Sequence, residues 1–485
     1  MIWVFINKNN LEYDIYTLFK AFFPEEEINI VCNTPHKESG RIPSFYDILC
    51  SEERIYCGFY QEDKPVNEKT AIILKDDISN TKNSIKRCLY DLLKEQSLKE
   101  LPWGILTGIR PVKLPMMMLK EGKSQAGIEK FLQDNYYVSP EKSALSYEIA
   151  VREKNILDKI NVKTGYSLYI GIPFCPTTCL YCSFTSYPLS KWKERIPLYL
   201  EHLKKEIKEV KELYAGTDPD TVYIGGGTPT TLSAEQLEEL ISYLNSVFDL
   251  SKVLEFTVEA GRPDSITREK LKVMKKCGVN RISINPQTMN DETLKIIGRH
   301  HTTEDIKQAF FLAREYGFDN INMDIILGLP GEKSEHVLHT MSEINKLKPD
   351  SLTVHSMAIK RAAKMSEYLK LHPELKSINT YEMMSAVDEN ARALNLKPYY
   401  LYRQKNMSGN FENIGYAKEE KYGIYNILIM EEVQSIVACG AGTVSKRVYE
   451  NGKIERCDNV KDIDLYMNRF EEMLERKRKL FASSQ

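Results

Sequence analysis

The chain has no long hydrophobic run and no block of like charges. Its longest apolar stretches, such as residues 424–430, are far too short to span a bilayer. The 485 residues carry a formal net charge of −2, and no five consecutive residues share one sign, which points away from nucleic acid and anionic membranes as partners. The first six residues are apolar but lack a basic leader, and Lys8 follows, so we expect no signal peptide. We therefore expect a cytoplasmic protein without a membrane span.

The sequence also lacks the cysteine pattern of a disulfide framework. Three of its ten cysteines stand in one short run, and the other seven are scattered, as expected for a protein of a reducing compartment. We interpret these seven as buried small hydrophobic residues rather than as a second cluster: Cys32, Cys50, Cys57, Cys88, Cys277, Cys439 and Cys457. The composition, with 42% hydrophobic and 28% charged residues, is that of a globular protein, and the length allows two or three domains.

The short cysteine run has the spacing C-x3-C-x2-C. Cys175, Cys179 and Cys182 follow a strand-like segment directly, with no fourth cysteine nearby. A [4Fe–4S] cube normally takes four thiolates, so three would leave one iron open to bind a small ligand. The alternatives are a three-cysteine zinc site or buried free thiols. Zinc requires a fourth ligand, and the nearest histidine, His202, lies in a helical pattern 20 residues beyond the last cysteine. The spacing therefore favours an iron–sulfur cluster.

Between residues 161 and 365 the pattern of strand, loop and helix repeats six times. The expected strands are 167–172, 221–224, 255–259, 281–285, 321–327 and 351–355. Helical segments separate them, which implies a parallel sheet, either an open doubly wound sheet or a partial (β/α)6 barrel. In both arrangements the carboxyl ends of the strands meet at one mouth, where ligands bind. The chemically distinctive residues all fall at or just after those ends.

Two regions flank this predicted α/β core. Residues 1–160 contain strand-like runs at 2–6, 28–31, 46–50, 55–60 and 71–74, and helical patterns at 79–98, 112–134 and 139–160. They predict a small N-terminal α/β domain. Residues 366–485 predict a mixed C-terminal α+β domain that serves as a lid or substrate domain. Its expected elements are strands at 399–403 and 425–430, a glycine turn at 440–442 and a terminal helix from 462 to about 480.

Several residues at the strand ends suit a polar cofactor. The run Gly225-Gly-Gly-Thr-Pro229 would let backbone approach a ligand closely, although a tight strand-to-helix turn needs the same residues. Glu259 ends the third strand, where a carboxylate suits an ammonium or sulfonium group. Gln287 and Arg299 follow the fourth strand. Asp324 lies inside the apolar fifth strand, where a carboxylate is costly without a partner, so it is either a ligand for ribose hydroxyls or the anchor of a buried network.

The cysteine run and the glycine segment together resemble the radical S-adenosylmethionine (SAM) superfamily. Arg281-Ile-Ser-Ile-Asn-Pro-Gln287 and Asp324-Ile-Ile-Leu-Gly-Leu-Pro330 narrow the resemblance to the oxygen-independent coproporphyrinogen III oxidase (dehydrogenase) family, over roughly 165–365. The segments 101–113 and 402–410 are similar to the long branch of that family, found in anaerobic and spore-forming Gram-positive bacteria.

The resemblance implies specific roles for residues of this chain. Cys175, Cys179 and Cys182 would hold a [4Fe–4S] cluster, SAM would chelate the open iron, and reductive cleavage would give a 5′-deoxyadenosyl radical. The implied SAM contacts are Tyr169, Gly226, Gly227, Thr228, Glu259, Gln287, Arg299, Asp324 and Ala358. The family binds two SAM molecules, and Ile326 and Ala358 stand at positions where some of the contacts with them occur.

The implied activity is radical SAM oxidative decarboxylation of coproporphyrinogen III propionates to vinyl groups, in haem and porphyrin biosynthesis under anaerobic conditions. Two departures from the well-characterised short branch keep other activities open. Gly171 stands where that branch has histidine, and Phe184 where it has a fourth cysteine. Cys182-Ser-Phe184 and Gly298-Arg-His300 resemble the relatives that serve as haem chaperones. The alternatives are therefore a haem-binding chaperone without decarboxylase activity and a radical SAM enzyme that acts on haem itself.

A tetrapyrrole with four carboxylates should meet cations around an apolar floor. The candidate cations follow strand ends or lie in the tail, and each could instead be a solvated surface residue: Arg262, Arg299, His300, His301, Lys360, Arg361 and Arg403. We expect a monomer that receives electrons from a donor such as flavodoxin or ferredoxin, as the resemblance implies.

Overall fold

The computed structural model describes residues 1–33, 42–73, 78–358, 364–404, 407 and 411–482. The chain divides into two compact units. The N-terminal unit comprises Met1–Val151 together with Tyr402–Glu412, and the barrel unit comprises Arg152–Leu401 together with Asn413–Gln485. No helix of the described residues is long and apolar enough to cross a membrane.

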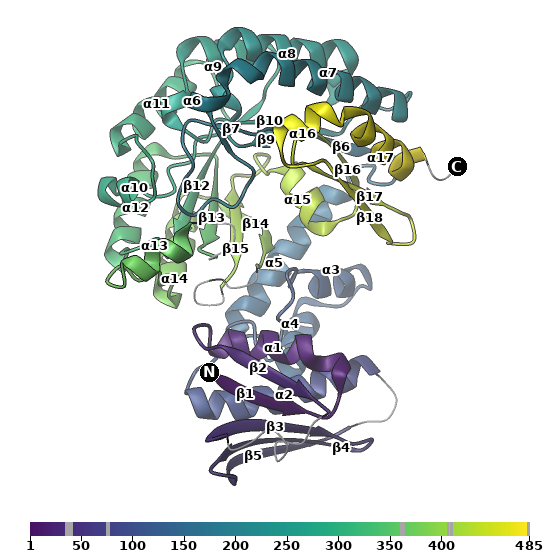
Figure 1. The fold of residues 1–485 in the computed structure, drawn as a ribbon, viewed down its shortest axis with the longest axis vertical. Coiled ribbons are helices and arrows are strands. Elements are labelled where there is room, and N and C mark those ends of the chain that lie inside the picture. The colour runs from purple at the N-terminus through teal and green to yellow at the C-terminus, as the bar shows by residue number, and fades with distance from the viewer. Residues whose placement is uncertain (34–41, 74–77, 359–363, 405–406, 408–410, 483–485) are drawn as a thin grey trace. The chain divides into compact units, whose positions relative to one another are not determined.

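The N-terminal unit is built on a five-stranded sheet of order β2-β1-β3-β4-β5 (Figure 1). Strand β1 is parallel to β2 and β3, and β3, β4 and β5 form an antiparallel meander. The strands are β1 (Ile2–Ile6), β2 (Ile28–Cys32), β3 (Ser44–Cys50), β4 (Arg54–Gln61) and β5 (Lys64–Ile72). Helices α1 (Glu12–Phe22) and α2 (Ile78–Ser97) supply Phe19 and Leu89 to the core that they share with the sheet.

Three elements of this unit differ from the sequence-based expectations. Helix α1 was not expected, and β5 ends at Ile72 instead of beginning at 71. The helix expected over 112–134 is two helices, α3 (Lys113–Lys120) and α4 (Gln125–Tyr136). Gly122 takes a positive φ of 77° between them, and Ser124 caps α4 by accepting a hydrogen bond from the Gly127 N–H. Helix α5 (Pro140–Leu157) follows.

The segment Tyr402–Glu412 is tied to this unit by a buried carboxylate. Glu412, whose side chain is 1% exposed, accepts a hydrogen bond from Trp103 Nε1 at 2.8 Å. Its other oxygen lies 2.5 Å from Lys142 Nζ. Arg403 donates to the carbonyl oxygen of Leu106, and its backbone N–H donates to Ile109. A short piece of the C-terminal half of the sequence is therefore part of the N-terminal unit.

The barrel unit contains the six predicted parallel strands, in the sheet order β6-β9-β10-β11-β12-β13. They are β6 (Tyr166–Ile172), β9 (Thr221–Gly226), β10 (Glu255–Glu259), β11 (Arg281–Ser283), β12 (Ile321–Leu327) and β13 (Ser351–Ser356). The helices that connect them line the outside of the sheet (Figure 1): α7 (Ile196–Leu213), α8 (Ala234–Val247), α9 (Arg268–Lys276), α10 (Asp291–Ile296), α11 (Thr303–Glu315) and α12 (Ser334–Leu347). The predicted α/β fold with a partial (β/α)6 barrel is confirmed.

The C-terminal region extends this sheet at both edges. Strand β15 (Asn413–Ala417) is antiparallel to β13, with β14 (Lys397–Tyr402) outside it. At the other edge β16 (Ser435–Cys439) is parallel to β6, and β17 (Val444–Val448) and β18 (Ile454–Asp458) follow antiparallel. The helices of the region are α13 (Met365–Leu371), α14 (Tyr381–Ala393), α16 (Ile463–Asn468) and α17 (Phe470–Ala482).

The strand expected at 425–430 is wrong. These residues form helix α15 (Ile424–Glu431), which buries Tyr425 and Leu428 at helical spacing. The next residue, Glu432, ends the helix with a φ of 51°. A short apolar run fits a buried strand and a buried helix equally well, so its sequence did not distinguish them. The single terminal helix is in fact two, α16 and α17.

Candidate functional site

A closed loop after β6 carries the three neighbouring cysteines. Strand β7 (Phe174–Cys175) pairs with β8 (Tyr187–Pro188) at the base of the loop. Phe174 is fully buried and packs its ring at 84° against Tyr199 of α7. The Leu180 N–H donates to the carbonyl of Ile297, and Thr177 Oγ1 donates to that of Gly298. The loop is thus fixed at its base and against the segment that follows α10.

The three thiols lie in different surroundings on this loop. Cys175 is 9% exposed, and Thr228 Oγ1 lies 3.6 Å from its Sγ atom. Burial, and then the neighbouring Cys182 and Cys179, raise the pKa of Cys175 to about 11. Arg262 Nη1 lies 3.7 Å from Cys179 Sγ, and the Cys182 N–H donates to the Cys179 carbonyl. Metal ligation would have to deprotonate the Cys175 thiol against its buried setting.

Among the described residues, no three His, Cys, Asp or Glu side chains are gathered tightly enough to hold a metal ion. Ligands of an iron–sulfur cube bind different iron atoms, so they stand farther apart than the ligands of one ion. The assignment of Cys175, Cys179 and Cys182 to a cluster therefore stays a prediction.

The glycine segment lies directly against the cysteine loop. A Cβ atom at Gly227 would lie 2.6 Å from the Phe174 carbonyl oxygen and 3.0 Å from Cys175 Sγ. Gly226 has a φ of 112°, and a Cβ atom there would lie 3.1 Å from the Ile172 carbonyl oxygen. The N–H groups of Gly227 and Thr228 donate to Ile172 and Phe174. Only glycine allows the two segments to pack this closely, so Gly226, Gly227 and Thr228, here called the glycine cradle, lie directly beside the cysteine loop.

Glu259 ends β10 beside this cradle. Tyr223 of β9 donates a hydrogen bond of 2.6 Å to Glu259 Oε1, and its ring stacks on Tyr425 of α15 at 4.5 Å. Tyr169 of β6 stacks on both tyrosines, at 5.9 and 6.1 Å. Burial raises the pKa of Glu259 to about 7, although the Tyr223 hydrogen bond opposes the rise. Its carboxyl group therefore changes charge near neutral pH, and a bound cation would hold it ionised.

Asp324 stands inside β12 with polar neighbours on both sides. Asn322 Nδ2 donates to Asp324 Oδ1 at 2.7 Å, and His355 Nε2 lies 3.8 Å from Oδ2. Burial acts to raise the pKa of Asp324, but His355, Asn322 and Thr353 together hold it below its ordinary value. The carboxylate is ionised and half-buried, as either of its two predicted roles requires.

Gln287 is held in a strained backbone conformation beside Asp324. Its φ is 66°, in the left-handed region that non-glycine residues rarely adopt. Two hydrogen bonds to β12 fix it there: its N–H donates to the Asp324 carbonyl, and its carbonyl accepts from the Ile326 N–H. Strain of this kind persists where the surroundings over-determine it, often at functional sites.

The remaining predicted SAM contacts lie at the same strand ends. Arg299 is 5% exposed and donates to the carbonyls of Asn285 and Gly261 and to Tyr181 of the cysteine loop, at 2.5, 3.2 and 3.3 Å. Ile326 is buried in β12, next to His355 of β13. Ala358 is half-buried, two residues after β13 ends.

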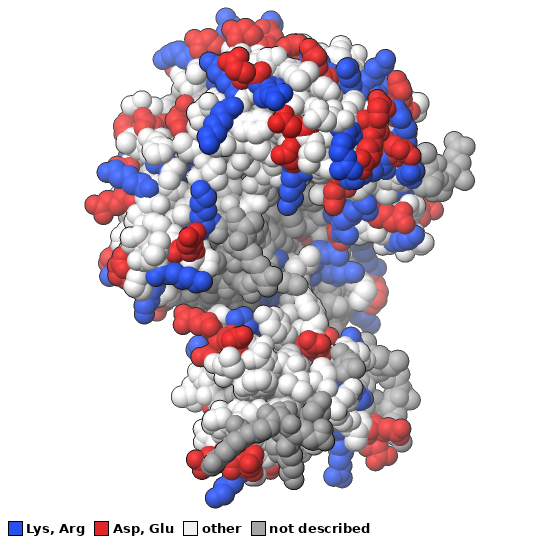
Figure 2. All heavy atoms as spheres, viewed as in Figure 1, with Lys and Arg blue, Asp and Glu red and all other residues white. Residues whose placement is uncertain are grey.

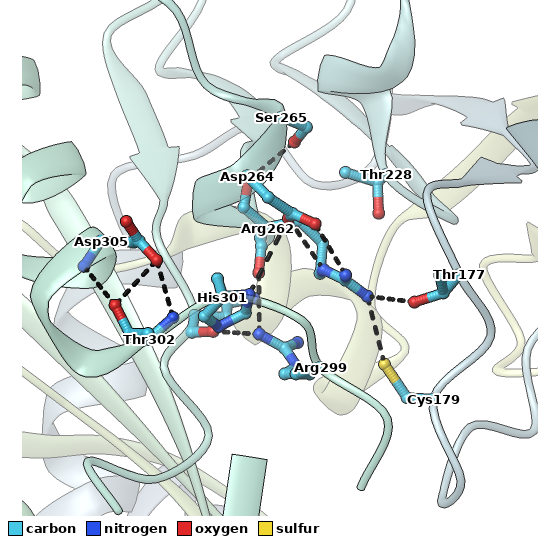
Figure 3. A network of polar contacts seen from close by, with 12 residues as sticks. Thr177, Cys179, Thr228, Arg262, Asp264, Ser265, Arg299, His301, Thr302 and Asp305 are labelled. Carbon is cyan, nitrogen blue, oxygen red and sulfur yellow. Dashed lines mark hydrogen bonds and ion pairs between the residues drawn. The ribbon is translucent and has the colours of Figure 1, made fainter. Parts of the chain in front are cut away.

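The candidate substrate cations that the structure describes lie in different surroundings. Arg262, Arg299 and His301 are buried with protein neighbours (Figure 3), and burial lowers the pKa of His301 to about 4. Arg403 belongs to the N-terminal unit. His300 is exposed, and Lys360 and Arg361 lie outside the described residues. The three buried side chains are therefore not surface cations, and among the described candidates of the barrel unit only His300 is exposed.

Two positions that depart from the short branch have clear surroundings. A Cβ atom at Gly171 would lie 2.5 Å from the Thr443 methyl group, so the turn after β16 fills the space that a side chain would take. The Tyr199 hydroxyl also contacts this residue, because it donates a hydrogen bond of 2.6 Å to the Gly171 carbonyl. Phe184 is 72% exposed at the end of the cysteine loop.

The residues at this mouth fit a polar cofactor. Buried polar atoms without a hydrogen-bond partner among the described residues include Asn285 Oδ1, Gln287 Oε1 and Arg299 Nε. Such atoms are costly unless a ligand or water meets them. Together with the glycine cradle and two carboxylates, they match the donors and acceptors of SAM beside a cluster. The sequence analysis missed Tyr223 and Asn322. Each lies two residues before a predicted site residue, Gly225 or Asp324, and therefore on the same face of its strand.

Comparisons with known proteins agree with this fold. The Radical SAM superfamily matches residues 169–344. The oxygen-independent coproporphyrinogen-III oxidase-like protein HemZ of Bacillus subtilis is 42% identical over 408 residues, which cover 83% of this chain and 81% of the relative. The heme chaperone HemW of the same organism is 41% identical over 194 residues, 40% of this chain and 50% of that protein. The coproporphyrinogen III oxidase HemN of Escherichia coli, a solved structure, has a TM-score of 0.51 at 21% identity, over 66% of this chain and 73% of that one.

Proposed function

This chain belongs to the family of oxygen-independent coproporphyrinogen-III oxidase-like proteins within the radical SAM superfamily, and on that basis we propose that it oxidatively decarboxylates the propionate groups of coproporphyrinogen III. The superfamily implies a [4Fe–4S] cluster and SAM as cofactors. The observation that carries the proposal is the contact between the glycine cradle and the three-thiol loop at the mouth of the barrel.

Each group at the mouth has a part in this proposal. Cys175, Cys179 and Cys182 hold the cluster, and a cluster with bound SAM would supply hydrogen abstraction from an unactivated carbon. The glycine cradle lies directly against the cysteine loop, and the SAM amino acid moiety would bind beside it.

The two carboxylates and the strained glutamine hold the rest of SAM. Glu259, with a pKa of about 7, becomes a carboxylate beside a cationic ligand, while Asp324 is ionised already and accepts from ribose hydroxyls. Gln287 has an unpaired, buried Oε1 atom that would accept a hydrogen bond from SAM. Tyr169, Arg299, Ile326 and Ala358 would supply the remaining contacts. Two SAM molecules would divide these contacts between them.

The reaction balances for each propionate. The β-carbon loses one hydrogen atom, the carboxylate leaves as CO2, and one electron passes to an acceptor, which converts the side chain to a vinyl group. A flavodoxin or ferredoxin would supply the reducing electron to the cluster.

The test is an anaerobic incubation of reconstituted protein with SAM, a low-potential reductant, a one-electron acceptor and coproporphyrinogen III, followed by mass spectrometry. We expect products that have lost CO2 and two hydrogen atoms from one propionic acid group and then from a second. Cys179→Ala protein and reactions without SAM are the controls. Cleavage of SAM by the intact protein without any change in the tetrapyrrole would contradict the proposal.

The surroundings of Gly171 favour a second candidate, a haem chaperone. The space beside this residue is filled by Thr443, and a relative named as a heme chaperone is 41% identical over 194 residues. Titration with haem, followed by absorbance, distinguishes the two. Uptake of one haem per chain, with the tetrapyrrole substrate unchanged, would support the chaperone.

A further inference from the structure

The structure contains a buried cation against the cysteine loop that the proposed chemistry does not yet use. Arg262 lies three residues after Glu259 and is 3% exposed. Its Nη1 atom lies 3.7 Å from Cys179 Sγ and 3.2 Å from Thr177 Oγ1 (Figure 3). One guanidinium group therefore contacts a predicted cluster ligand and a hydroxyl of the same loop.

A carboxylate fixes the orientation of this guanidinium. Arg262 Nε lies 3.1 Å from Asp264 Oδ1, and Nη2 lies 2.9 Å from Oδ2, a bidentate pair. Burial acts to raise the pKa of Asp264, but Arg262 and the other cations nearby hold it below its ordinary value, so the pair is ionised. Planar, bidentate pairs of this kind are the most strongly oriented ion pairs in proteins. The Nη1 group therefore points at Cys179 without freedom to turn away.

The donors to the cysteines differ in charge. Cys175 receives a neutral hydroxyl from Thr228, whereas Cys179 receives a guanidinium N–H. Reduction adds one electron to a cluster, and the added negative charge is spread over its sulfur ligands. Hydrogen bonds and positive charges at those sulfurs make reduction easier, because they stabilise the electron-rich state more. In a buried setting the effect of a nearby charge is larger than in water.

We propose that Arg262, oriented by Asp264, is a positioning residue that raises the reduction potential of the cluster through its hydrogen bond to Cys179. The inference rests on the proposed cluster site. A higher reduction potential lets a physiological electron donor reduce the cluster more readily. Arg262 would act in this step without contacting the tetrapyrrole.

The test is a potentiometric titration of the reconstituted full-length protein without SAM, followed by electron paramagnetic resonance of the reduced cluster. We expect Arg262→Gln to keep its iron and sulfide but to show a more negative midpoint. A tenfold loss of reduced cluster at a fixed potential corresponds to about 59 mV for one electron. Arg262→Lys keeps the positive charge but not the bidentate pairing with Asp264, so its midpoint should lie between those of the wild type and Arg262→Gln. Arg268→Gln is the matched control, since Arg268 is 61% exposed and pairs with Glu315 at the surface.

The outcomes separate the inference from the function on which it rests. If the wild-type protein assembles no cluster, the result contradicts the proposed function itself. Arg262→Gln with full iron and the wild-type midpoint would overturn the inference alone. If Arg262→Gln takes up no iron, Arg262→Lys decides: full iron with a more negative midpoint supports the role, and full iron with an unchanged midpoint rejects it.

Discussion

Tyr223 donates a hydrogen bond of 2.6 Å to Glu259 and so opposes the rise that burial gives to the pKa of this carboxyl group. The folded-state pKa of Glu259 is about 7 against an ordinary 4.5, with burial as the main cause. Between these two values the folded protein binds the proton more tightly than the unfolded chain does. The stability from this group is therefore fully present below pH 4.5 and is lost as pH rises to about 7. Linkage gives roughly 3 kcal/mol across the window.

Glu259→Gln should abolish this part of the pH dependence, because the amide does not titrate. Denaturant unfolding of the apo-protein at intervals from pH 4.5 to 8 measures it, as the difference between variant and wild type. Tyr223→Phe should move the window to higher pH, since the Tyr223 hydrogen bond lowers the pKa of Glu259. Parallel curves for wild type and Glu259→Gln would show that the carboxyl group is not perturbed.

The cluster ligands are tested by removing one thiol. Cys179→Ala should fail to retain a full [4Fe–4S] complement, because two remaining cysteines hold too few irons of a cube. Iron and sulfide analysis of anaerobically reconstituted protein measures the loss. Cys277→Ala is a matched control, because Cys277 is half-buried at the end of α9 and outside the cysteine loop. A full complement in Cys179→Ala would rule out the assignment.

The barrel could be predicted because its pattern is local. Each strand is a short apolar run followed by a helix with one apolar face, and the crossover rule then leaves few arrangements. The local pattern did not show whether residues 424–430 form a strand or a helix. It also gave no sign that Glu412 packs with residues of the N-terminal unit, because its partners Lys142 and Trp103 lie 270 and 309 positions away. Contacts of that sequence separation leave no trace in periodicity.

The candidate site divides in the same way. The thiol loop and the glycine cradle carry spacing signals that follow from their chemistry, and the structure places them in contact. Arg262 and His301 carry no such signal. The sequence analysis named both as candidate cations for substrate carboxylates, with a solvated surface position as the alternative. In the structure a carboxylate two residues away, Asp264, pairs with Arg262 instead. Whether a charge after a strand end faces solvent or a buried partner depends on side-chain geometry that one sequence does not contain.

Asp324→Ala tests the second carboxylate of the mouth. If Asp324 binds ribose hydroxyls, the variant should keep its cluster and lose SAM affinity by about 1.5–3 kcal/mol, the contribution of a hydrogen bond to a charged group. Equilibrium binding of SAM to the reconstituted protein measures this. Asp319→Ala is the matched control, because Asp319 is a carboxylate that is 76% exposed and pairs with Lys421 away from the carboxyl ends of the strands. Unchanged SAM affinity in a folded Asp324→Ala variant would make Asp324 a structural anchor.

The last prediction concerns how little of the chain the cluster needs. Every residue predicted to hold the cluster or SAM belongs to the barrel unit, whose sheet contains no strand from residues 1–151. A fragment that begins at Pro140 keeps helix α5 whole and retains Lys142, which pairs with the carboxylate of Glu412. We expect this fragment to take up about four irons per chain, as the full-length protein would. Iron analysis and circular dichroism of the two proteins measure cluster content and folding together. A soluble, folded fragment that assembles no cluster would show that the N-terminal unit is needed to build the site.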